Sequence, residues 1–368
     1  MIYLSKYKTA ASRETTVIED NHFVQRVHWF SDTYDRVKTG MVYPPHVLAS
    51  KVLTPDILDY VKNNPVKGKT GFILAAGSQG WAGIRAKNDN QEKGMLYYSY
   101  KVPLITLTNI YAGRVASMFG VEDFVSTDAS ACASSIKVLM EAQNLMHNFG
   151  FDRMIILGVE DAVNNSTLEF FGHAKASLLF KDEETMKPSA FDSVHSGFHV
   201  GQGAAVAILE KEPACEPAAK FLGAYTSAEN CTNPLGQRPD GQGYRKAIEG
   251  AMDVAKIKPE EIKIVKTHGT GTPVNNQAEK TAITTVLKDF KATSYKQHIG
   301  HTLAASGLLE TGLLIDDLTK GILPGIKNRT EEDQQFISED TPIEGGTFLS
   351  LAAGMGNIYS AALFSTEV

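Results

Sequence analysis

Residues 126–135 read STDASACASS, and this stretch decides the fold prediction. It follows an apolar, strand-like segment and leads into residues 133–149, where apolar side chains recur near helical spacing. Cys132 is therefore predicted to lie at a sharp turn between a strand and a helix. Strands that feed directly into helices are the repeating unit of α/β folds, so an α/β chain is expected.

The position of Cys132 makes it a candidate nucleophile. The start of a helix offers free N–H groups and partial positive charge, and both favour a thiolate over a thiol. The flanking alanines and serines leave room for a substrate, and the same N–H groups could hold the oxyanion formed when a thioester is attacked. A small buried cysteine packed under a helix is the competing interpretation, and the residues alone leave both open.

The α/β pattern continues along the chain. Strands are predicted at residues 71–77, 153–158, 204–209 and 261–265. Helices are predicted at residues 244–256, 277–290 and 303–319. The Pro- and Glu-rich residues 210–218 (EKEPACEPA) are the best candidate boundary, which predicts two halves at 1–212 and 213–368. A polar surface loop is expected at residues 86–94 (AKNDNQEKG).

Composition excludes several classes of protein. The chain has 368 residues and a formal net charge of -6, and Lys and Arg form no dense cluster, so no nucleic-acid partner is expected. The cysteines number three and form no CxxC pair, which argues against a disulfide framework and favours a reducing compartment. No apolar run reaches the roughly 18 residues of a membrane span, and no signal peptide is recognised. A cytoplasmic protein is predicted.

Two histidines lie in motifs that could complete a site. Residues 267–273 (THGTGTP) place His268 just past a predicted strand, where the sites of α/β proteins usually form. Residues 296–301 (KQHIGH) place His301 after a glycine, with Lys296 before it and Glu310 in the following helix. Each residue alone could equally be a loop histidine or a solvated charge. A cysteine with distant histidines also suits a hydrolase or a three-ligand metal site.

Together, these elements resemble the elongating β-ketoacyl-acyl carrier protein synthases, which are thiolase-fold condensing enzymes. The resemblance includes the order Cys132, His268, His301, the lysine five residues before His301 and the glutamate nine residues after it. Residues 190–209 (AFDSVHSGFHVGQGAAVAIL) and 354–357 (GMGN) are also similar to family segments. The departures from the family pattern described below favour a specialised type II polyketide or polyene ketosynthase.

The resemblance implies a role for each catalytic residue. Cys132 would carry an acyl group, and His268 and His301 would each present an N–H to the enolate oxygen formed when a malonyl thioester loses carbon dioxide. Lys296 and Glu310 would orient the histidines and balance charge.

It also implies where substrate would bind. Thr270 and Thr272 would contact the pantetheine arm. A second negative oxygen forms when the carbanion attacks the acyl-Cys132 carbonyl. The backbone N–H of Cys132 and one from the loop at Ala353 and Gly354 would both donate to it. No metal or organic cofactor is expected, since an acyl carrier protein brings the phosphopantetheine arm.

The implied architecture is a five-layered α-β-α-β-α arrangement made by two similar halves. The implied partners are an acyl carrier protein and a second synthase subunit, in a homodimer or in a heterodimer with a sister subunit. A non-catalytic, chain-length-determining subunit of such a heterodimer is an alternative function, although those subunits usually lack the nucleophile that this chain keeps. A Cys–His hydrolase leaves the paired histidines unexplained.

Several positions depart from the family pattern. Ala352 and Ala353 stand where a gating aromatic is usual, Asn276 and Ser196 stand where aspartates are usual, and the segment before Cys132 is short. Residues 42–51 and 55–63 are expected to be what remains of helices that line the acyl pocket or cap the fold. These changes favour a specialised branch, whose acyl substrate the sequence does not reveal.

Overall fold

The computed structural model describes residues 1–13, 15–20, 23–28, 48–77, 107–163, 165–174, 176, 187–331 and 333–368. The elements of the first half are β1 (Ile2–Ala11), β2 (Thr15–Asp20), β3 (Phe23–His28), α3 (Pro55–Asn63), β4 (Lys69–Ala75), α6 (Thr108–Met118), β5 (Phe124–Asp128), η1 (Ala131–Ala133), α7 (Ser134–Asn148), β6 (Phe151–Asp161), α8 (Asn165–His173) and β7 (Val200–Glu210), where η marks a 3-10 turn.

The elements of the second half are β8 (Ala219–Ala228), α9 (Gln242–Ala255), η2 (Pro259–Glu261), β9 (Ile262–Lys266), α10 (Pro273–Val286), β10 (Lys291–Thr293), α11 (Lys296–Ile299), η3 (Leu303–Ala305), α12 (Ser306–Thr319), β11 (Ile322–Leu323), β12 (Thr341–Pro342), β13 (Thr347–Gly354) and β14 (Ile358–Ser365). The predicted strands and helices are all present. The helix predicted at 277–290 begins earlier, because Pro273 is well suited to the first turn of a helix, and it ends at Val286. The predicted loop at 86–94 and residues 42–47 lie outside the described part.

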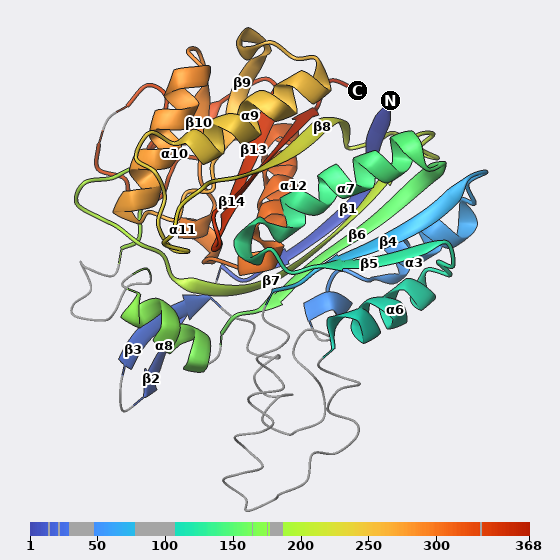
Figure 1. The fold of residues 1–368 in the computed structure, drawn as a ribbon, viewed down its shortest axis with the longest axis horizontal. Helices are drawn as coiled ribbons and strands as arrows, with labels where there is room; N and C mark the ends of the chain where they lie inside the picture. Colours follow the sequence, from blue (N-terminus) through green and yellow to red (C-terminus); the bar gives the residue numbers. More distant parts are fainter. Residues whose placement is uncertain are drawn as a thin grey trace, which may run out of the picture.

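The sheet repeats one topology twice. Its strand order is β10-β9-β13-β14-β8-β1-β7-β6-β4-β5, so the second-half and first-half strands form two blocks that meet at β8 and β1 (Figure 1). In each block the three strands furthest from the junction are parallel, and the other pairings along this strand order are antiparallel. Strand β3, which lies outside this order, pairs with β7 in parallel and with β2. The structure therefore confirms two similar α/β halves. The boundary at residues 212 and 213 remains a prediction within the link from β7 to β8.

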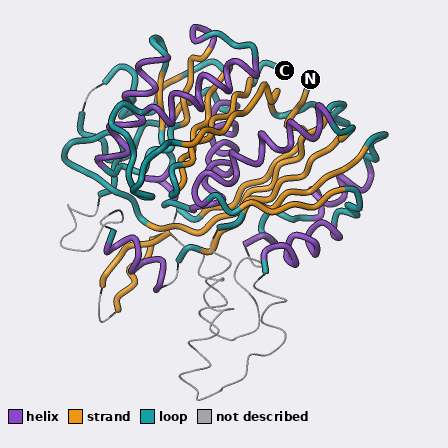
Figure 2. Tube along the Cα trace, in the orientation of Figure 1, coloured by secondary structure: helices purple, strands orange, loops and turns teal. Residues whose placement is uncertain are grey.

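Helices form three layers around the two blocks of the sheet (Figures 1 and 2). The apolar faces of α3 and α6 share a core with β4 and β6, and those of α9 and α10 share another with β9, β13 and β14. Helices α7 and α12 lie between the blocks and pack on both, in the central core. This gives the predicted five layers. No helix among the residues described above is both long and apolar enough to cross a membrane.

The central layer explains why the site residues meet. Helix α7 follows η1 in the first half, and α12 follows η3 in the second half, so the two turns are equivalent in the repeated topology. Ala131 in η1 and Leu303 in η3 both have positive φ, 48° and 42°. A non-glycine residue rarely adopts this backbone conformation, and strained positions of this kind cluster at functional sites.

Candidate active site

Cys132 lies in the turn η1 between β5 and α7, as the sequence predicts, and only 5% of it is exposed. Asp128, at the end of β5, fixes the turn by accepting a hydrogen bond from the backbone N–H of Ser130 at 2.9 Å. Gly354, at the end of β13, packs directly against the turn: a Cβ placed there would lie 2.5 Å from the carbonyl oxygen of Ser130. The structure thus brings the predicted loop at Ala353 and Gly354 against the turn that carries Cys132.

The protonation state of Cys132 differs from the expectation. Burial raises the pKa of the Cys132 thiol to about 12, although the Lys296 ammonium and a backbone hydrogen bond oppose the rise. The helix start favours a thiolate, as the sequence suggested, but burial acts in the opposite direction and has the larger effect on this sulfur. Removal from water penalises a lone negative charge more than the helix start favours it. Cys132 is therefore a thiol at neutral pH.

His268 follows β9 in a loop held by one buried carboxylate. Glu279 of α10 accepts hydrogen bonds from the backbone N–H groups of His268 at 2.5 Å and Gly269 at 2.9 Å. Asn275 donates to the same carboxylate at 2.9 Å. Gly269 has a φ of 57°, which a glycine adopts without strain. The loop is therefore rigid, and it fixes the imidazole of His268 at the junction of the halves.

His301 reaches the same junction from the second half. Its backbone N–H donates to the carbonyl of His199 at 2.7 Å, and its carbonyl accepts from Gly201 at 3.0 Å, so it lies along the start of β7. The rings of His268 and His301 have centroids 5.6 Å apart and are nearly perpendicular, at 79°. Two imidazoles that are 33 residues apart in sequence therefore share one small space.

A buried charge cluster supports these histidines. Lys296 donates to one carboxylate oxygen of Glu310 at 2.7 Å, and Lys266 donates to the other at 3.1 Å. All three side chains have 0% exposure, which rules out the interpretation of Lys296 and Glu310 as solvated charges. Lys266 also donates to the carbonyl of Leu351 at 2.6 Å, so it ties β9 and α12 to the strand that leads to Gly354.

Both histidines are neutral in this environment. Burial, followed by the charge of Lys296, lowers the pKa of His268 and of His301 well below the usual histidine value, and Lys266 contributes in the same direction. Burial alone would raise the pKa of Glu310, but the ammoniums of Lys296 and Lys266 lower it further than burial raises it, so the carboxyl group is ionised. The site thus holds two neutral imidazoles beside two ammonium groups and one carboxylate.

These shifts predict the acid side of the pH–rate profile. Activity that needs neutral imidazoles is expected to persist below pH 6.5, where an ordinary histidine becomes charged. In Lys266→Met, loss of a nearby positive charge raises both histidine pKa values, so the acid limb moves to higher pH. Turnover measured between roughly pH 5 and 9 checks this. An acid limb that stays in place in Lys266→Met would contradict the charge argument.

The remaining predicted residues lie around this centre. Thr270 is buried, Thr272 is half-buried, and their hydroxyl oxygens are 3.3 Å apart in the loop after His268. Ala353 is buried beside Gly354, and Asn276 donates to the carbonyl of Gly271 at 3.4 Å. The structure places the two threonines and Ala353 near the catalytic candidates, and their roles in substrate binding remain predictions. His298 is half-buried rather than solvated, and its Nε2 lies 3.2 Å from the carbonyl oxygen of Gly325.

Sequence reasoning missed several residues at this site. Lys266 follows the predicted strand at 261–265, and a lysine at the end of a strand gives no signal of complete burial. Ser306 contacts both His301 and Glu310. Phe198 meets His301 edge-on, with ring centroids 4.9 Å apart, and Phe171 of α8 meets Phe198 at 5.4 Å. Both rings belong to the same apolar cluster as Cys132. The aromatic side chains that pack around this part of the site therefore come from α8 and from the segment before β7.

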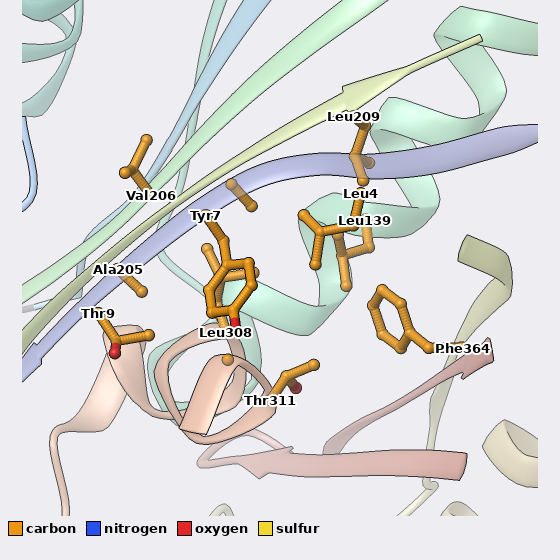
Figure 3. A pocket seen from close by; sticks show the side chains of 12 residues that line it. Leu4, Tyr7, Thr9, Leu139, Ala205, Val206, Leu209, Leu308, Thr311 and Phe364 are labelled. Carbon is orange, nitrogen blue, oxygen red and sulfur yellow. The ribbon is translucent and has the colours of Figure 1, made fainter. Parts of the chain in front are cut away.

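A small cavity lies where β1 and β7 pack on α7 and α12 (Figure 3). It has a volume of about 10 Å³, and its lining is almost entirely apolar. Leu139, Leu308 and Phe364 are among the residues that close it. A space that holds about one water molecule cannot take an acyl chain, so this cavity is a packing gap and not a substrate pocket.

Parts of the chain match known protein domains and known proteins in sequence. The β-ketoacyl synthase N-terminal domain matches residues 46–214, and the β-ketoacyl synthase C-terminal domain matches residues 218–330. The chain is 27% identical over 282 residues to the oxytetracycline polyketide putative beta-ketoacyl synthase 1 of Streptomyces rimosus, which covers 73% of this chain and 65% of that protein. It is 28% identical over 280 residues to the 3-oxoacyl-acyl-carrier-protein synthase 2 of Synechocystis sp., and this alignment covers 72% of this chain and 66% of that protein.

Alignments with the first relatives span less than two thirds of their length, for example 65% and 62%. Among solved structures, a type II polyketide acyl-carrier protein in complex with its ketosynthase (AntDE:AntF) contains a chain with a TM-score of 0.83 and 17% identity, over 99% of this chain and 98% of that one. A ketosynthase (ApeO) in complex with its chain length factor (ApeC) from Xenorhabdus doucetiae has a TM-score of 0.79 and 18% sequence identity, and the alignment covers 99% of this chain and 97% of that chain. At these identities the likeness concerns the fold, which is the thiolase-like fold of ketosynthases. Because the two domain matches together cover most of the chain, this protein belongs to the β-ketoacyl synthase family.

Proposed function

We propose that this chain is a β-ketoacyl synthase, an acyltransferase that joins an acyl group on Cys132 to a malonyl unit on an acyl carrier protein, with loss of carbon dioxide. One observation carries the proposal: the neutral imidazoles of His268 and His301 have ring centroids 5.6 Å apart where the two halves meet, and His301 packs on Phe198, which shares an apolar cluster with Cys132. Membership of the family and the names of the relatives support the same reaction.

The chemistry has two stages. In the first, the sulfur of Cys132 attacks the thioester of an acyl carrier protein, the carrier thiol leaves, and the thiol proton passes to it. In the second, a malonyl thioester loses carbon dioxide, and the remaining electron pair forms a carbon nucleophile that attacks the acyl-Cys132 carbonyl. The new carbon–carbon bond forms as the bond to sulfur breaks, which releases the β-ketoacyl product.

Negative charge develops on two oxygens, and the site offers groups for each. A neutral imidazole can donate an N–H to the enolate oxygen, and the buried setting strengthens that hydrogen bond. The backbone N–H of Cys132 and the end of β13 at Ala353 would share the oxygen of the attacked thioester, and the packing of Gly354 against the turn of Cys132 supports this role. No organic cofactor is required, because the phosphopantetheine arm arrives with the carrier protein.

The exposed edge of β5 supports assembly with a second subunit. This strand ends the sheet, its described pairing is with β4 alone, and Val125 on it is 41% exposed. An unpaired edge is a ready template for another strand, so we place a dimer contact here, next to the turn of Cys132. The solved relatives include a ketosynthase with its acyl carrier protein and one with a chain length factor.

Cys132, Cys215 and Cys231 are all free, which supports a reducing compartment such as the cytoplasm.

A non-catalytic, chain-length-determining partner is the second candidate. The observation in its favour is the fold similarity to complexes that contain a chain length factor. The retained Cys132 and the supported histidine pair favour the active synthase instead, since an inert subunit has no need for either.

Intact-protein mass spectrometry tests the proposal. The protein is incubated with acyl carrier proteins loaded with acyl groups of different length, and the mass added to the chain is measured before and after malonyl carrier protein is supplied. An acyl mass that appears on Cys132 and is then released with carbon dioxide is expected. Absence of any adduct, with condensation by a co-purified second synthase, would establish the partner role instead.

A further inference from the structure

Ser306 connects the charge cluster to one of the two histidines. It is the first residue of α12 and is 1% exposed. Its hydroxyl donates to Oε1 of Glu310 at 2.5 Å, and its oxygen lies 3.3 Å from Nδ1 of His301. The side chain therefore lies between a carboxylate and an imidazole, and contacts both.

The number of available protons decides how this contact is made. A serine hydroxyl has one proton to donate, and an ionised carboxylate can only accept. Glu310 is ionised, because Lys266 and Lys296 both donate to it. The hydroxyl proton of Ser306 therefore points to Glu310, and the serine oxygen is left to accept a hydrogen bond from Nδ1 of His301.

A neutral imidazole has one N–H, so a proton on Nδ1 leaves Nε2 with a free electron pair. We propose that Ser306 fixes His301 as the Nδ1–H tautomer and thereby makes its Nε2 the acceptor for the proton of Cys132, while His268 remains the hydrogen-bond donor. This differs from the expectation from the sequence that both histidines present an N–H to the substrate. Ser306 acts through His301 and is a positioning residue.

The inference rests on the proposed acyl transfer, and it supplies a step which that reaction needs. Cys132 rests as a buried thiol, so acylation requires an acceptor for its proton. As the sulfur–carbon bond to the acyl group forms, the proton moves from sulfur to Nε2 of His301. It then passes to the carrier thiol as the old thioester bond breaks, and His301 returns to its starting state.

Other charged and titratable groups around His301 leave this assignment in place. Lys296 of α11 and Lys266 of β9 carry positive charge, which keeps the resting imidazole of His301 neutral, so the imidazolium formed during the transfer is short-lived. Glu310 of α12 is the one negative group shown to bond with Ser306. His268 faces the ring of His301 at 5.6 Å, and Phe198 covers another side at 4.9 Å. Within the described residues, Ser306 is the polar side chain seen at Nδ1 of His301.

Nitrogen NMR on the resting protein tests the tautomer directly. The full chain is deuterated and labelled with ¹⁵N-histidine, and two-bond proton–nitrogen correlations are recorded at neutral pH, with His301→Gln used to assign the signals. We expect Nδ1 of His301 to be protonated and Nε2 to be bare. In Ser306→Ala, the proton is expected to redistribute to Nε2. A wild-type His301 with its proton on Nε2 overturns the proposal, whether or not the chain is an active synthase.

Kinetics provide the second readout. Acylation of Cys132 by acyl carrier protein is timed separately from condensation. Loss of a correctly placed proton acceptor typically costs about 10²-fold or more, so Ser306→Ala is expected to slow acylation by that order and to alter its pH dependence. Ser306→Thr, which keeps the hydroxyl, is expected to recover both the tautomer and the rate.

Thr319→Ala is the matched control for these measurements. It removes a hydroxyl at the far end of the same helix, where Thr319 donates to the carbonyl of Ile315 at 2.9 Å. It is expected to acylate at the wild-type rate. If Ser306→Ala folds and acylates as fast as Thr319→Ala, the role of Ser306 is refuted, although the proposed synthase activity would stand.

Discussion

Cys132→Ala is expected to reduce condensation to the assay background while the fold stays intact. Removal of a covalent nucleophile lowers acyl transfer on the order of 10⁶-fold in a well-studied hydrolase. The substitution replaces a small buried side chain with a smaller one, so the free energy of unfolding should fall by only about 1 kcal/mol. Product formation from acyl and malonyl carrier proteins measures the first effect, and thermal unfolding measures the second.

The other two cysteines provide matched controls. Cys215 is exposed and Cys231 is half-buried, and neither belongs to the cluster around the catalytic histidines. Cys215→Ala and Cys231→Ala should therefore retain wild-type condensation and remain acylated. Condensation that survives in Cys132→Ala but disappears when a co-purified second synthase is removed would show that this chain is the non-catalytic partner.

The strands and helices were predictable from the sequence where the local residue pattern was compatible with only one type of secondary structure. The segments around β4, β6 and β7 are short, aliphatic runs bounded by turn residues, and they are buried on both sides because helices cover both faces of the sheet. The turn at Cys132 was predictable because a strand, a run of small residues and a helical period follow one another directly. The repeated strand order arises from long-range pairing, such as Ile2 with Phe221, which local patterns do not reveal.

The candidate site was predicted only in part, for a physical reason. Motif spacing identified Cys132, His268 and His301, but the state of each group depends on what surrounds it. Burial makes Cys132 a thiol despite its place at a helix start, and a second lysine, Lys266 of β9, joins the Lys296–Glu310 pair between helices α11 and α12. Desolvation and the sharing of one carboxylate are properties of the packed structure, which residue spacing does not contain.

Glu310→Gln is expected to damage both stability and catalysis. The carboxylate is fully buried and accepts hydrogen bonds from Lys266, Lys296 and Ser306. An amide of similar size leaves two ammonium groups without a counter-charge, and breaking a buried pair in this way typically costs about 3–5 kcal/mol. The same change removes the carboxylate that holds the hydroxyl proton of Ser306, so Ser306 no longer fixes the tautomer of His301. Denaturant unfolding and condensation assays on the purified variant measure the two losses.

The pH dependence separates charge imbalance from lost packing. Burial already lowers the pKa of Lys266, and loss of the carboxylate lowers it further, so the folded variant binds fewer protons than the unfolded chain does. Its stability should therefore rise with pH towards the ordinary lysine pKa of about 10.4 and recover part of the loss. The double variant Lys266→Met with Glu310→Gln removes one of the two uncompensated charges and should be more stable than Glu310→Gln alone. Equal stability of the single and double variants at neutral pH, with no rise at high pH, would show that the amide fails through packing. The two lysines would then contribute no net charge strain to the site.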